Sequence, residues 1–146
     1  MCKIIEIAIS RKFKAKMESV DYIEAVEGKG IINDRYFKEN NHKKSQITLI
    51  EIENIDYYNQ TFKTSIDPIN FRRNIVTQGI RLNELINKEF FIGNIKLKGH
   101  DLCRPCKSLQ QNLGQNNIIK EFLKKGGLRC EVLKSGKVSV GDKIEF

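Results

Sequence analysis

The sequence predicts a mainly β protein of the α+β class, in which short strands close into a barrel or a sandwich. Most of its segments are short, rich in Ile and Val, and separated by Gly, Asn or Lys turns. This pattern is typical of strands and not of long helices. Closure into a barrel or sandwich removes exposed sheet edges. The expected strands are Lys3–Ser10, Ser19–Val26, Ser45–Ile50, Arg72–Thr77, Glu89–Ile92, Ile95–Gly99, Leu128–Leu133 and Lys143–Phe146.

Two helices are expected at the periphery of these strands. Glu51–Gln60 follows a strand directly, and Asn117–Lys124 places its apolar side chains on one face. The second segment runs into two lysines and then Gly126 and Gly127. Cations in a last turn followed by glycine are a helix-stop signal, so these glycines need only a structural explanation.

The length of 146 residues fits one domain spanning residues 1–146 that buries a core without disulfides. The first ten residues alternate in polarity, which predicts a strand and not a secretory signal. No segment approaches the roughly 20 apolar residues that cross a bilayer. We therefore expect a cytoplasmic protein with no membrane partner.

The chain is basic, with 26 Lys and Arg against 18 Asp and Glu and a formal net charge of +8. This charge favours an anionic partner. The run Arg11-Lys12-Phe13-Lys14-Ala15-Lys16 could follow a nucleic-acid backbone, although a solvated surface run is the simpler interpretation. A nucleic-acid-binding barrel is therefore kept only as a minor alternative.

Four cysteines stand at positions 2, 103, 106 and 130, and a cytosol would keep them reduced. Cys2 and Cys130 lie in apolar strand patterns, where a thiol is ordinarily a packing residue. Cys103-Arg104-Pro105-Cys106 differs, because its proline ends the preceding strand. Arg104, Lys107 and the start of a helical turn over Lys107–Gln111 would favour the thiolate form of Cys106.

Several uses compete for this Cys-x-x-Cys motif. A zinc site would need a second pair of ligands, yet the other cysteines are far apart and only His42 and His100 exist. A thioredoxin-like motif would open a long helix after the first strand, whereas this motif lies late in a β-rich chain. A single thiolate that binds a metal or carries sulfur remains, beside two cysteines merely packed at a strand end.

Two further stretches carry polar groups suited to a ligand. If Asn70–Thr77 is extended, one face presents Asn70, Arg72 and Asn74, which suits a phosphorylated, pterin-like ligand. The Gly28–Tyr36 loop contains Asp34 and Arg35, which can pair with each other or with a ligand. This loop lacks the ending of a phosphate-binding Walker A motif.

Together and in this order, these stretches resemble the MOSC domain, named for the C-terminal domain of molybdenum cofactor sulfurases. The similarity extends over most of the chain. It includes residues 30–36, 46–50, 70–77, 102–106, 126–133 and 140–142. Asn33 and Tyr36 stand where many members have glycine and histidine, so no histidine role is carried over.

The resemblance implies a MOSC-type β-barrel with a few short peripheral helices, and binding of molybdenum cofactor (molybdopterin). Cys106 matches the cysteine that ligates molybdenum in cofactor-binding members, and a soft thiolate suits that metal. Arg72 and Asn74 would hold the pterin or its phosphate. Further cofactor-binding candidates are Arg35, Asn70, Thr77 and Cys103.

The resemblance also implies two activities. One is reduction of N-hydroxylated compounds with electrons from a separate reductase. The other is delivery or sulfuration of the cofactor, in which Cys106 acts as a sulfur carrier alongside a cysteine desulfurase. A non-enzymatic cofactor carrier or storage module is the rival. Pyridoxal phosphate belongs to the family through the sulfurase fusion, and we do not expect it to bind this chain directly.

Overall fold

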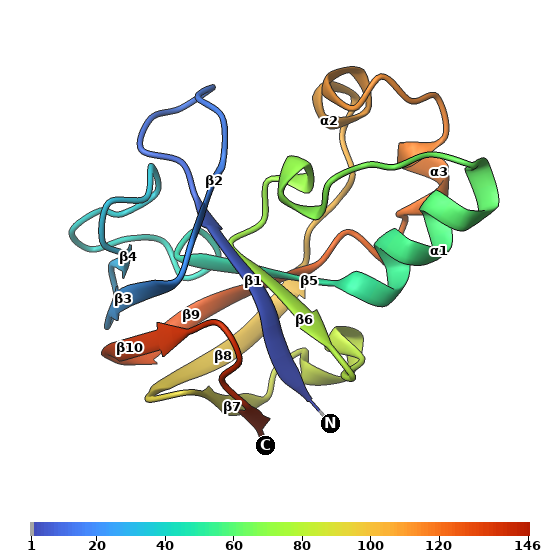
Figure 1. Ribbon diagram of the computed structural model, residues 1–146. Coiled ribbons are helices and arrows are strands. Elements are labelled where there is room, and N and C mark those ends of the chain that lie inside the picture. The colour runs from blue at the N-terminus through green and yellow to red at the C-terminus, as the bar shows by residue number, and fades with distance from the viewer. Residues whose placement is uncertain (1) are drawn as a thin grey trace.

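The computed structural model describes residues 2–146 as two curved β-sheets with the helices gathered to one side (Figure 1). The larger sheet has eight strands in the order β11-β7-β8-β9-β5-β6-β1-β2, and the smaller has the order β10-β3-β4. The strands are β1 Lys3–Ile9, β2 Glu18–Val20, β3 Tyr22–Val26, β4 Gly30–Ile31, β5 Ile47–Glu51, β6 Ile75–Gln78, β7 Glu89–Ile92, β8 Ile95–Leu102, β9 Leu128–Lys134, β10 Gly136–Ser139 and β11 Ile144–Glu145. The helices are α1 Ile52–Phe62, α2 Lys107–Asn112 and α3 Ile118–Glu121, with 3-10 turns η1 Pro68–Phe71 and η2 Leu82–Leu85.

The mainly β class is confirmed, and the larger sheet curls into a barrel-like form that is not fully closed. β2 and β11 are the two ends of its strand order. Even so, the N–H of Ile4 donates to the Asp142 carbonyl at 2.9 Å, and the N–H of Gly141 donates to the Ile4 carbonyl at 2.8 Å. The first strand therefore lies against the segment that leads into the last one, and the chain ends are neighbours in Figure 1.

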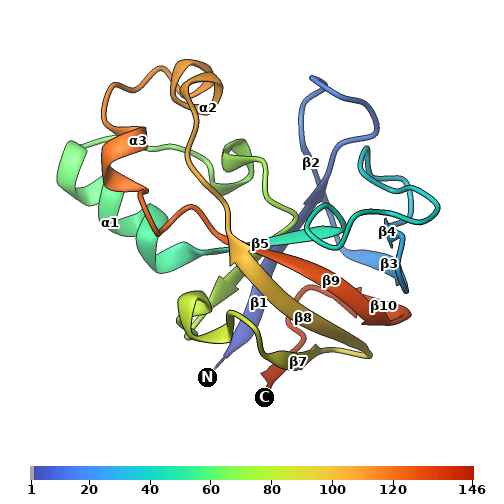
Figure 2. The ribbon, with the colours of Figure 1, turned by 180° about the vertical axis from the view of Figure 1, so that it is seen from behind.

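The interior of the curled sheet is filled by alternate side chains of its strands. In β9, Leu128, Cys130 and Val132 are buried while their neighbours are partly exposed, as expected for a strand with one face inward. β8 follows the same alternation and is visible beside β9 in Figure 2. Cys130 is fully buried in this core, which agrees with its predicted packing role.

A second apolar cluster joins the helices to the outer face of β5 and β6. Ile50 and Val76 from the sheet meet Tyr58 of α1 and the aromatic rings of Phe71 and Phe122. The Phe122 ring centroid lies 4.8 Å from that of Phe71 and 5.6 Å from that of Tyr58. Because Phe71 ends η1 and the cluster also includes Leu109 of α2, this packing fixes two segments that border the site described below.

Most of the expected elements are present, with shifted ends. The helix expected over Glu51–Gln60 is α1, which runs to Phe62. The strand expected over Ser19–Val26 is two strands, β2 and β3, which belong to different sheets. The helix expected over Asn117–Lys124 is regular only through Glu121.

The strand expected over Arg72–Thr77 is wrong for its first half. Asp67 accepts a hydrogen bond from the Ile69 N–H, and Pro68 begins the 3-10 turn, a combination that favours a turn over a strand. Arg72 then adopts a left-handed backbone with φ of 64°, and β6 begins only at Ile75. Asn70, Arg72 and Asn74 consequently do not share one strand face.

Within residues 2–146, no helix is long and apolar enough to cross a membrane.

Gly127→Ala should destabilise the protein by about 3 kcal/mol, because it adds steric overlap to backbone strain. Gly127 has φ of +112°, and a Cβ there would overlap the Leu49 carbonyl oxygen. Urea unfolding measures the loss. Gly114→Ala is the matched control, since Gly114 has φ of +65° and open space around it; it should cost about 1 kcal/mol. Equal losses for the two variants would contradict the overlap.

Candidate functional site

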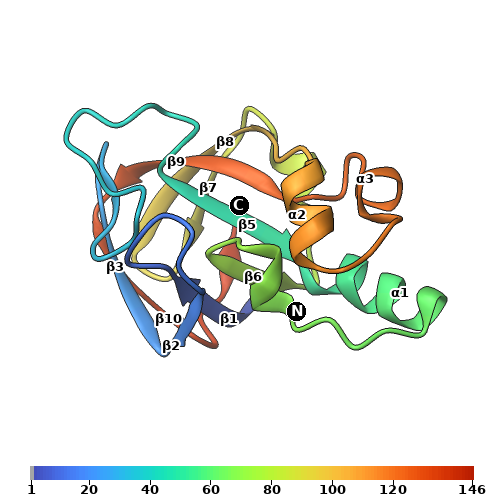
Figure 3. The ribbon, with the colours of Figure 1, turned by 90° about the horizontal axis from the view of Figure 1, so that it is seen from above.

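The β1–β2 loop, η1 and α2 lie at one end of the molecule, which Figure 3 views from above. Residues of these segments line two adjacent pockets. The strand pocket, about 280 Å³, is bordered by the start of β5 and by Cys103. The helix pocket, about 600 Å³, is bordered by Phe13, Cys106 and α2. Both are lined by Arg35, Tyr36, Arg72 and Arg73. We call the two pockets together the arginine groove.

The charged side chains that line the arginine groove are all basic. None of the described residues that line either pocket is acidic. A concave surface lined by one sign of charge concentrates ligands of the opposite sign, so this lining suits an anion. Its cationic lining residues are Lys14, Arg35, Lys44, Arg72, Arg73, Arg104 and Arg129.

Arg72 is the central cation of the arginine groove. Its Nη1 donates to the Ala15 carbonyl oxygen at 2.9 Å. Arg72 has a left-handed backbone and directly follows η1. Burial, followed by the nearby Arg35 guanidinium, lowers the pKa of Arg72. An anion bound between Arg35 and Arg72 would relieve this repulsion between like charges.

Arg35 is held by the carboxylate of its neighbour. The side chains of Asp34 and Arg35 are 0% and 7% exposed, and Asp34 Oδ1 lies 3.3 Å from Arg35 Nη1. The same oxygen accepts the Ser10 N–H at 3.1 Å, and Oδ2 accepts the Tyr36 N–H at 3.4 Å. The sequence left open whether Asp34 and Arg35 pair with each other or with a ligand. In the structure they pair with each other, and Arg35 still lines both pockets.

Asn74 lines the strand pocket, but its amide is occupied by the backbone. Its Oδ1 accepts the Thr48 N–H at 3.1 Å, and its Nδ2 donates to the Ala8 carbonyl at 3.2 Å. The side chain therefore ties β1 to β5 at the floor of the groove. Two other predicted residues lie elsewhere: Thr77 is fully buried and donates to the Ile50 carbonyl, and Asn70 lines a separate pocket with Asn112 and Gln115.

The two cysteines of the motif are in different environments. Cys103 is 4% exposed and lines the strand pocket; burial raises the pKa of its thiol, and Arg73 and Arg129 oppose that rise. Cys106 is exposed, lines the helix pocket and precedes α2, where its Sγ accepts the Leu109 N–H at 3.4 Å. Cys106 is thus the accessible thiol of the pair.

Five cations of the groove were not among the predicted cofactor-binding residues: Lys14, Lys44, Arg73, Arg104 and Arg129. Arg73 Nε donates to the Gly126 carbonyl at 2.8 Å. This position was not predicted because residues 70–77 were expected to form an extended strand. Lys44 and Arg129 lie on either side of the Asp101 carboxylate, at 3.2 and 3.7 Å, and Arg104 borders the strand pocket. The available signal was arginine next to cysteine in both the Cys-Arg-Pro-Cys and the Leu-Arg-Cys stretches.

The described part of the chain, residues 2–146, contains no group of three or more His, Cys, Asp or Glu side chains that could hold a metal ion. His100 instead lies 2.9 Å from Glu131, measured from Nε2 to Oε1. A metal bound at Cys106 would need its remaining ligands from a bound molecule.

Fold and site together define a small β-rich protein with a groove lined by basic side chains and one exposed cysteine, Cys106. The family model of the MOSC domain matches residues 36–145, and the chain therefore belongs to the MOSC domain family. The match begins after Arg35, so the Asp34–Arg35 pair lies outside it. Comparison with curated proteins gave no match.

Several solved structures share the fold. The YuaD protein from Bacillus subtilis aligns with a TM-score of 0.84 at 18% identity, over 99% of this chain and 95% of that one. YiiM from Geobacillus stearothermophilus aligns with a TM-score of 0.78 at 14% identity, over 99% and 74%. YiiM from Escherichia coli aligns with a TM-score of 0.73 at 18% identity, over 98% and 68%. At these identities the comparison establishes the fold alone.

Asp34→Asn should lower the free energy of unfolding by about 3 kcal/mol, because it removes one partner of a buried ion pair and leaves Arg35 without a counter-charge. Urea unfolding at neutral pH measures the effect. Asp21→Asn is the control, since Asp21 is exposed and its replacement should leave the midpoint unchanged. Equal midpoints for both variants would contradict the role given to Asp34.

The buried thiols should make the protein less stable as the pH rises above about 9. Burial raises the pKa of Cys103 and Cys130 above the ordinary value of 9.0, so the unfolded chain loses protons that the folded chain keeps. Stability is then full below pH 9 and declines toward the folded pKa. Cys130→Ala should make this decline shallower by up to about 1.4 kcal/mol per pH unit. Val132→Ala, a buried change in the same strand without a thiol, should keep the original slope.

Proposed function

We propose that the protein binds molybdenum cofactor in the arginine groove, with Cys106 as the thiolate ligand to molybdenum. The observation that carries this proposal is that an exposed thiol lines the same groove as Arg35, Arg72 and Arg73. Membership of the MOSC family supports it, because the family is associated with this cofactor.

The donor set fits the cofactor. A pterin with a phosphate tail is anionic, and arginine forks bind phosphate in a bidentate manner. Arg72 and Arg73 would hold the tail, since each of these guanidinium groups is anchored only to backbone carbonyl oxygens. Arg35 would contribute charge from its fixed position beside Asp34, and Asn74 would support the floor without gripping the ligand.

The accessibility of the two thiols favours Cys106 over Cys103 as the ligand. A cysteine binds a metal through its thiolate form. Cys103 is buried with a raised pKa, which keeps it protonated, and Cys106 is exposed at the helix pocket. We assign Cys103 to the wall of the strand pocket, where it packs against Gly126–Gly127: its backbone N–H donates to the Gly127 carbonyl at 2.7 Å.

We further propose that the loaded protein reduces N-hydroxylated compounds. In this reaction the N–O bond breaks, the oxygen leaves as water with two protons, and two electrons come from a separate reductase. The bound cofactor supplies the oxygen-atom and electron-transfer chemistry. The chain supplies the anchor at Cys106, the cationic walls that orient the cofactor, and the helix pocket, whose room beside Cys106 admits a second molecule.

A cofactor carrier or sulfur carrier is the second candidate, because the same thiol and cations would serve storage, sulfuration or transfer. Steady reduction of an N-hydroxylated purine by loaded protein with a reductase would establish the enzyme. Molybdenum retention without turnover, together with transfer to an acceptor protein, would establish the carrier. Salt-sensitive RNA retention that is unaffected by Cys106→Ser would favour a nucleic-acid-binding barrel instead.

Cys106→Ser should remove molybdenum from protein purified from its own host, while Cys103→Ser should retain most of it. The reason is that Cys106 presents an exposed thiol to the groove, whereas Cys103 is buried. Molybdenum by mass spectrometry and released pterin by fluorescence are the measurements. Cys2→Ser controls for loss of any thiol. Equal retention in the Cys106 and Cys103 variants would rule out Cys106 as the ligand.

A further inference from the structure

The helix pocket has an aromatic wall that molybdenum binding does not use. Phe13 lies in the β1–β2 loop and borders this pocket together with Tyr36 and Leu109. It is 66% exposed, a large apolar surface for a side chain at the mouth of a charged groove. In Figures 1 and 3 the loop stands across η1 from α2.

The loop that carries Phe13 is held at its base. The Ser10 hydroxyl, which is buried, lies 2.8 Å from the Lys12 carbonyl oxygen and 3.1 Å from that of Ala15. Arg72 donates to the same Ala15 carbonyl. These contacts fix the turn from both the β1 side and the groove side, so Phe13 is presented by an anchored loop.

The Phe13 ring is also oriented. It meets the Tyr36 ring edge to face, with centroids 5.3 Å apart and planes at 89°. The Arg35 guanidinium carbon lies 4.7 Å from the Tyr36 ring centroid, and Arg35 is itself paired with buried Asp34. A chain of contacts thus runs from a buried carboxylate to an exposed phenyl ring, which leaves much of that ring open to the pocket.

A cation adjoins this ring. Lys14 follows Phe13, lines the helix pocket, and has no ion-pair partner among residues 2–146. Its backbone is left-handed, with φ of 66°. Aromatic rings stack on aromatic platforms in offset or edge-to-face geometry, and an ammonium group attracts a carboxylate or similar anion. The Phe13 ring and the Lys14 ammonium group together suit an aromatic ligand that carries a negative charge.

We infer that Phe13 is a specificity determinant of the helix pocket, where it receives the planar ring of an aromatic anion whose charged group contacts Lys14. The inference rests on the proposed function only in taking the helix pocket as the substrate side of the groove. Binding of the ring itself needs neither the cofactor nor Cys106.

Direct binding of 2-naphthoate tests the inference. Its fluorescence can be followed cleanly because the sequence contains no Trp, and decahydro-2-naphthoate serves as a saturated competitor of the same charge. The protein as purified should prefer naphthoate by roughly two- to tenfold, the range of an aromatic pair. Phe13→Leu should abolish this preference. Lys14→Gln should lower the affinity for both ligands by the same factor.

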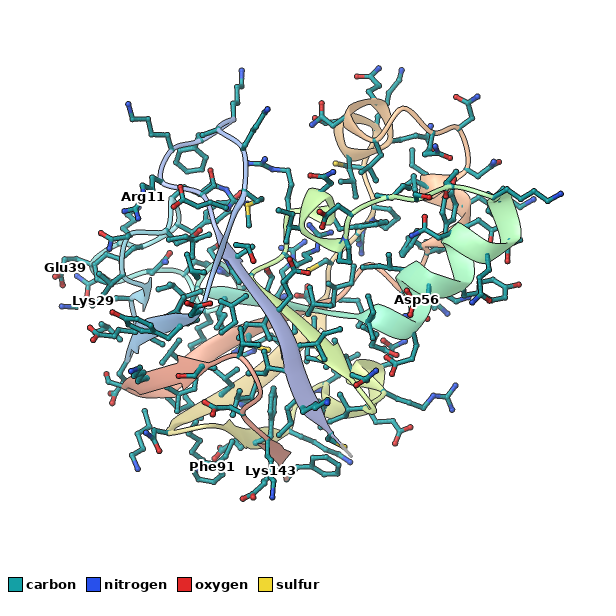
Figure 4. The ribbon with its side chains drawn as sticks, viewed as in Figure 1. Arg11, Lys29, Glu39, Asp56, Phe91 and Lys143 are labelled. Carbon is teal, nitrogen blue, oxygen red and sulfur yellow. The ribbon has the colours of Figure 1, made fainter. Side chains whose placement is uncertain are left out.

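Phe91→Leu is the matched control, because Phe91 is another exposed aromatic with a nearby lysine and lies at the opposite end of the molecule (Figure 4). It should leave the preference intact. Unchanged preference in Phe13→Leu, or no naphthoate binding by the wild-type protein, would overturn the inference. Cys106→Ser should retain the ring preference, so failure of the molybdenum assignment is distinguishable from failure of this one.

Discussion

The arginine groove depends on the buried carboxylate of Asp34. This one group accepts hydrogen bonds from the backbone at Ser10 and Tyr36 and pairs with the Arg35 guanidinium. It therefore connects the end of β1, the loop after β4 and the cationic wall of both pockets. Burying a charge is costly unless it is paired and hydrogen-bonded, and here the pairing fixes a second charge where a ligand can use it.

Asn74 performs the corresponding task at the floor of the groove. It stands between the left-handed turn at Arg72 and the start of β6, and its amide satisfies backbone groups of β1 and β5. The β5–β6 pair is the parallel pair of the larger sheet. Because the Asn74 amide both donates and accepts, the backbone groups of β1 and β5 that it contacts remain hydrogen-bonded next to Arg72 and Arg73. The site therefore lies just before β6 begins, where the chain is not yet paired as a strand.

The fold was largely predictable because its signals are local. Alternating apolar residues mark β1, β8 and β9, and the period of α1 is helical. The accessible thiol could also be located, because Pro105 ends the extended segment before it. The direction of Arg72 could not be derived, because Asn70–Thr77 alternates like a strand and only the Asp67 cap and the aromatic packing of Phe71 select the turn. The cations from β9 and residue 44 join the groove through long-range pairing, which spacing along the chain does not encode.

The contact between Cys2–Ile4 and residues 141–144 has a consequence for the rate of folding. Ile7–Ile9 of β1 pair with β2, which follows closely in the chain. The backbone groups of Cys2–Ile4 instead depend on residues 141–144, which are far along the chain. Pairing between the two ends of a chain is the slowest kind to form, since a large loop must close first. Until that loop closes, the backbone groups of Cys2–Ile4 form an open strand edge that can pair with another chain.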